Sequence, residues 1–168
     1  MSSILLGLFL ISILSSLSSF AATPANEEEF EIRQLALDIL ERAYPNELFL
    51  SVKGNGLHAK IYKKLTHAQF FHVANSEKMP DCAPGGLAFV YLRRRQPEIY
   101  LCEFYQEITK VQKAQTLIHE ATHLAGVDDE CGATRSEIDA MLASGEGVSY
   151  QNKYVQKCEI SILPSTER

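Results

Sequence analysis

Two histidines spaced four residues apart are the residues of this chain best suited to chemistry. The sequence runs His119-Glu120-Ala121-Thr122-His123, and on a helix positions i and i+4 lie on one face, so both imidazoles can reach one point. A catalytic Zn²⁺ takes three protein ligands and keeps a fourth position for water. Glu120 lies one step around the helix, where its carboxylate can take a proton from that water. The pattern predicts a zinc site with Glu120 as general base.

The third ligand of such a site is expected in the acidic stretch after the second histidine. Gly126 allows the chain to leave the helix with a positive φ and to turn back. Asp129 lies on that return path, six residues after His123, and this spacing favours its carboxylate as the third ligand. Three other acids remain alternatives: Asp128, Glu130 and Glu137. A polar helix face without a metal is the alternative for the whole motif.

A helix and a hairpin must hold this motif in place. Apolar residues recur at helical spacing from Gln106 to Ala125, which predicts a helix that carries both histidines. The runs 87–92 and 98–102 are rich in β-branched and aromatic residues and are separated by five residues, so they predict an antiparallel hairpin. In HExxH enzymes the edge of such a strand can bind an extended substrate. A further helix is expected over 133–143.

Two more helices are expected before the hairpin. Residues 30–44 carry an apolar stripe that ends at Pro45, and the stretch 26–29 supplies an N-terminal start signal. A second helix is expected over 57–71, which has apolar residues on one side. Helices around one small antiparallel sheet make an α+β fold.

The N-terminal segment differs in composition from the rest of the chain. The first 22 residues carry no charged side chain, and residues 4–14 form an apolar run followed by small residues. This pattern predicts a signal peptide over 1–22, cleaved near Ala21 or Ala22, with an uncleaved N-terminal anchor as the alternative. The remaining residues, 23–168, have the size of one compact domain. The net charge of −5 argues against nucleic acid and anionic membranes as partners.

The chain has four cysteines. An even number behind a signal peptide predicts two disulfides and an oxidising compartment, so we expect a secreted or periplasmic protein. Of the three possible pairings, we favour Cys82–Cys102, which flanks the hairpin, and Cys131–Cys158, which ties the segment after the motif to the C-terminal region. A cysteine-bound zinc is the alternative, although the sequence contains no C-x-x-C pair.

Several of these stretches together resemble a known family of peptidases. The run 86–91, the strand 99–105 and the residues 115–118 that lead into the HExxH motif look like the deuterolysin and lysine-specific metalloendopeptidase group, the aspzincins. That group takes its third zinc ligand, an aspartate, from a G-T-x-D-x-x-Y-G stretch. Here the stretch from Gly126 to Asp129 matches as G-V-x-D, so the resemblance also selects Asp129. It further implies the Cys82–Cys102 disulfide.

The resemblance implies a small zincin-like domain that acts as a secreted zinc endopeptidase on protein or peptide substrates. We expect the protein to be a monomer. Two positions depart from the family motif: Val127 replaces its threonine, and Gly132 stands where its tyrosine would fall. That tyrosine is thought to help hold the oxyanion in the family. Either Tyr105, Tyr150 or Tyr154 is expected to replace it, or the oxyanion lacks this donor. A zinc-stabilised binding module without turnover is the competing expectation.

Overall fold

The computed structural model describes residues 22–24, 26–49, 56–74, 79–82, 85–148 and 153–160. Apart from Ala22, the expected signal peptide over 1–22 lies outside these residues, and so does Tyr150. Among the helices of the described ranges, none has the length and apolar character needed to cross a membrane. The domain is α+β, as expected, with helices packed around one small sheet.

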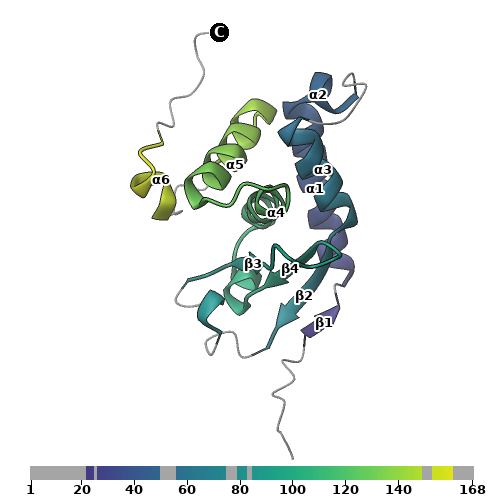
Figure 1. Cartoon of the computed structure of the whole chain (residues 1–168), viewed down its shortest axis with the longest axis vertical. Coiled ribbons are helices and arrows are strands. Elements are labelled where there is room, and N and C mark those ends of the chain that lie inside the picture. The colour runs from purple at the N-terminus through teal and green to yellow at the C-terminus, as the bar shows by residue number, and fades with distance from the viewer. Residues whose placement is uncertain are drawn as a thin grey trace, which may run out of the picture.

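The helix that carries the histidines lies at the centre of the domain. In Figure 1, α4 (Lys110–Leu124) is seen end-on, with α5 (Glu130–Ser144) on one side and α1 (Glu27–Ala43) with α3 (Leu57–His67) on the other. All three helices contact α4. Because α4 is surrounded, it buries apolar residues on more than one face; Leu117, Ile118 and Ala121 are all inaccessible to solvent. This burial fixes the position of the motif.

A sheet covers the remaining side of α4. Within the described residues it has four strands, in the order β1-β2-β4-β3. The strands are β1 (Ala22–Pro24), β2 (Gln69–Val73), β3 (Ala88–Val90) and β4 (Glu98–Leu101). β3 pairs with β4 in antiparallel fashion, β2 runs parallel to β4, and β1 pairs antiparallel to β2. The short helical segments are α2 (Pro45–Phe49), η2 (Pro80–Cys82), η3 (Glu103–Glu107) and α6 (Lys153–Lys157).

The two faces of the sheet pack differently because side chains alternate along each strand. Phe70, Ile99 and Leu101 point into the main core with the helices. On the other face the rings of Phe71 and Phe89 both stack on Tyr100. This outer face also holds the Cys82–Cys102 disulfide, which joins η2 to the end of β4. The second disulfide is Cys131–Cys158, so both predicted pairings are confirmed.

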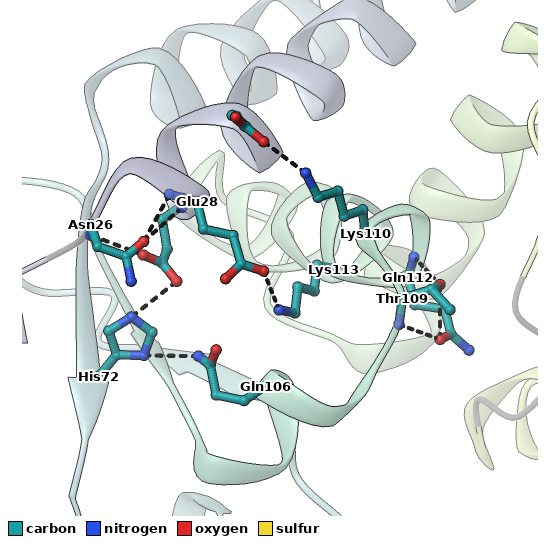
Figure 2. Close-up of polar contacts among 10 residues, drawn as sticks. Asn26, Glu28, His72, Gln106, Thr109, Lys110, Gln112 and Lys113 are labelled. Atoms are coloured by element: carbon teal, nitrogen blue, oxygen red, sulfur yellow. Dashed lines mark hydrogen bonds and ion pairs between the residues drawn. The ribbon is translucent and has the colours of Figure 1, made fainter.

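Polar contacts tie the start of α1 to the start of α4 (Figure 2). Lys113 is almost fully buried, and its Nζ lies 2.7 Å from Glu28 Oε1. Lys110 pairs with Glu31 one turn further along α1. Each helix also begins with a capping box, built on Asn26 in α1 and on Thr109 in α4. These contacts fix the angle at which α4 enters the core.

The structure confirms the predicted hairpin and most of the predicted helices, and it corrects one of them. The expected helix over 57–71 ends at His67, and residues 69–73 form β2 instead. Phe70, Phe71 and Val73 have side chains that favour strands, and both neighbours of β2 are available to pair with it. The helix over 106–125 begins only at Lys110, after η3, and the helix over 133–143 already begins at Glu130.

Candidate metal centre

The site lies where α4 ends and α5 begins. α4 presents His119 and His123 one turn apart, and Gly126 follows with φ 104°, as the sequence predicted for the turn. The chain then reverses and α5 starts at Glu130, packed along α4. The first turn of α5 is thereby brought beside the last turn of α4.

Three side chains converge at this junction. The Nε2 atoms of His119 and His123 lie 3.1 Å apart. Glu130 Oε2 lies 3.3 Å from His119 Nε2, and Glu130 Oε1 lies 3.7 Å from His123 Nε2. One ligand atom from each of the three residues lies within 4.8 Å of the others, so this group could hold a metal ion.

The Nδ1 atom of each ring has an oxygen atom beside it. His123 Nδ1 lies 2.7 Å from the carbonyl oxygen of Val127, which can only accept, so Nδ1 carries a proton. His119 Nδ1 lies 2.9 Å from Glu137 Oε2. Both Nε2 atoms are therefore directed at the same point. Two nitrogens bound to one tetrahedral Zn²⁺ at its usual bond length lie about 3.3 Å apart, close to the separation seen here.

The electrostatics of the junction suit a cation. Burial opposes a charge on His119, yet its contacts with Glu130 and Glu137 raise its pKa to about 10. In the metal-free protein a proton on this ring thus balances the nearby acids. Glu120 is buried, and this burial raises the pKa of Glu120 to about 7, with His119 opposing and Glu130 and Glu137 adding to the rise. A carboxyl with such a pKa is suited to accept and return a proton near neutral pH.

Asp129, the third ligand favoured by spacing, has a different place. It is the N-cap of α5, and its Oδ1 accepts a 2.7 Å hydrogen bond from the backbone N–H of Gly132. The structure brings together His119, His123 and Glu130, and Asp129 is not in this group. Aspartate directly before a helix is a common N-cap, so this signal was available in the sequence. Glu130, one of the alternatives, supplies the nearby carboxylate.

The surroundings of Gly132 explain why the tyrosine of the aspzincin motif would not fit at this position. A Cβ placed on Gly132 would lie 2.7 Å from Val127 Cγ1 and 2.8 Å from Asp129 Oδ2. Position 132 thus has no room for a tyrosine unless the cap of α5 moves. Tyr105, one of the expected replacements, is fully buried beside Lys113, near the start of α4 rather than its end. Tyr150 lies outside the described residues, and the side chain of Tyr154 is likewise not described.

The strand expected to border the site lies at an edge of the sheet. β3 has a single pairing partner, β4, among the described strands, and it packs against α4. Compared with protein-family models, with curated proteins and with solved structures, the chain shows no match.

Proposed function

We propose that this protein is an exported zinc-dependent endopeptidase. The observation that carries the proposal is the convergence of His119 Nε2, His123 Nε2 and a Glu130 carboxylate oxygen. The Nδ1 atom of each ring lies beside an oxygen atom of the protein, and the two Nε2 atoms face one point. Two imidazoles and one carboxylate are a ligand set typical of catalytic zinc.

Each residue has a definite task in the proposed reaction. Zinc at this position would lower the pKa of a bound water to about 7 and polarise the carbonyl of the substrate. Glu120 would act as the general base, whose carboxylate accepts a proton from the attacking water and passes it to the leaving amine. The edge of β3 binds the substrate backbone as an added strand, which lines the scissile bond up beside α4.

Export is part of the same proposal. The apolar leader over 1–22 predicts passage through a membrane. The two disulfides, Cys82–Cys102 and Cys131–Cys158, fit an oxidising compartment outside the cytoplasm.

A second candidate function is a zinc-stabilised binding module of the same fold. The observation in its favour is Gly132, whose surroundings leave no space for the oxyanion-binding tyrosine of the aspzincin motif. Such a module would bind the metal as tightly as an enzyme but would not cleave peptides.

The two functions are separated by measuring metal content and cleavage together. We expect about one zinc per chain in the purified protein, cleavage of a broad peptide library, and loss of cleavage with a chelator. Glu120→Gln should retain zinc and lower kcat/KM by about 10²- to 10⁴-fold. Zinc without cleavage in the wild type would leave only the binding module, and absence of zinc would overturn both.

A further inference from the structure

Behind the three convergent side chains lies a second, buried layer of polar residues. Glu137 on α5 is 2% exposed and Gln115 on α4 is 4% exposed. Gln115 Nε2 donates a 3.1 Å hydrogen bond to Glu137 Oε1. Glu137 Oε2 lies 2.9 Å from His119 Nδ1. The three residues form one chain of contacts from the interior to the metal-facing ring.

We propose that Glu137 and Gln115 are positioning residues that set the affinity of the site for zinc, although neither belongs to the ligand group. The inference rests on the proposed function, because it assumes that His119 is a metal ligand. It assigns Glu137, an alternative third ligand on sequence grounds, to the opposite side of the His119 ring.

The geometry of Glu137 gives it this role. A carboxylate beside Nδ1 favours a proton on that nitrogen, which would leave Nε2 to bind the metal and make it a stronger donor. The contact also restricts the orientation of the ring, because Glu137 is buried on α5 and contacts both Gln115 and His119 of α4. His123 is held by the Val127 carbonyl instead. The two ligating rings thus differ in the charge of the group behind them.

Gln115 has the complementary task of holding Glu137. It lies four residues before His119, so both side chains lie on the same face of α4. A buried carboxylate is costly unless hydrogen bonds compensate its charge. The amide of Gln115 supplies one such bond, and because it engages Oε1 it orients the carboxylate with Oε2 towards His119.

The test compares zinc affinity in three variants by competition with a chromophoric chelator. Glu137→Gln keeps the shape but removes the charge, and we expect a loss of about 10- to 100-fold. Gln115→Met removes only the hydrogen bond, and a smaller loss is expected. Glu29→Gln is the matched control. Glu29 is also a fully buried glutamate, 3.0 Å from His72, and its replacement should leave zinc affinity unchanged.

A second readout follows the His119 ring directly. In ¹⁵N-labelled, zinc-loaded protein, Glu137→Gln should shift the Nδ1–H resonance of His119 and leave that of His123 in place. Wild-type affinity in folded Glu137→Gln and Gln115→Met would overturn the inference while the zinc site stands. If Glu137→Gln does not fold, Gln115→Met decides, since it leaves all charges unchanged. A wild type without zinc would overturn the proposed function instead.

Discussion

Glutamate and aspartate differ by one methylene group. At the start of α5 this difference gives Asp129 and Glu130 different contacts. The short side chain of Asp129 reaches the backbone of its own helix, where it caps Gly132 N–H. The longer side chain of Glu130 extends from the next position, and helical side chains tilt towards the start of the helix, here towards α4. Of these neighbouring acids, Asp129 thus caps the helix, and Glu130 joins the group that could hold a metal ion.

This division predicts opposite effects of two alanine substitutions. Asp129→Ala should destabilise the protein by about 0.5–2 kcal/mol, because a helix cap is lost, with the zinc dissociation constant nearly unchanged. Glu130→Ala should raise that constant by more than about 100-fold, since a direct ligand outweighs an outer contact. Chemical denaturation and chelator competition measure the two effects. A large loss of zinc affinity in Asp129→Ala alone would return the ligand role to Asp129.

At the same scale, the sequence predicted the convergence of the two histidines and the turn at Gly126, because their spacing is local and helical geometry converts it directly into position. It favoured Asp129, whereas the group that the structure brings together contains its neighbour Glu130. The spacing from His123 along the chain favoured Asp129. The residue at which α5 begins, however, determines which side chain points back towards α4. The position of Glu137 beside His119 Nδ1 depends on how α5 packs on α4, and sequence spacing does not reveal this packing.

At the scale of elements, α4 is held at both ends. The contacts of His119 and His123 with α5 hold its C-terminal end. The ion pairs that join α4 to α1 hold its N-terminal end (Figure 2). The hydrogen bond from Lys113 and the charge of Lys113 lower the pKa of Glu28 below its ordinary value of 4.5. The ionised form of Glu28 is therefore favoured in the folded protein.

This lowered pKa predicts a pH-dependent contribution to stability. A carboxyl group whose folded pKa is depressed stabilises the fold above its unfolded pKa, and the contribution is lost as the pH falls through the folded pKa. The wild type should thus be more stable than Glu28→Gln at neutral pH, and the difference should shrink below about pH 4.5. Denaturant titrations between pH 3 and 7 measure it. Glu27→Gln, in the same helical turn, is the control, and an equal pH-dependent difference there would contradict the assignment to the Lys113 pair.

Elements were predictable where hydrophobic period and length agreed. The apolar stripe of α1 and the alternation in β3 and β4 each allow one structure. Residues 57–73 contain the helical pattern of α3 followed by the strand-forming residues of β2. No glycine or proline separates the two, so the sequence alone does not mark where the helix ends. The parallel pairing of β2 with β4 joins segments far apart in sequence. Such pairing leaves no short-range signal.

At the scale of the whole molecule, the two disulfides fasten different regions. Cys82–Cys102 lies on the outer face of the sheet, whereas Cys131 directly follows Glu130 in the first turn of α5. Its partner, Cys158, directly follows α6, and the backbone carbonyl of Cys158 accepts a hydrogen bond from Arg135 Nη2 at 3.2 Å. The second disulfide therefore steadies the turn that presents the proposed third ligand.

Removing each disulfide should separate stability from metal binding. The bridges span 20 and 27 residues, so replacing either pair with serine should cost about 3–4 kcal/mol on the loop-closure estimate. Only the loss of Cys131–Cys158 should weaken zinc binding, because it frees the first turn of α5 beside α4. Thermal unfolding and chelator competition on both double variants measure the two quantities. Equal zinc affinity in the two would show that the packing of α5 on α4 alone positions Glu130.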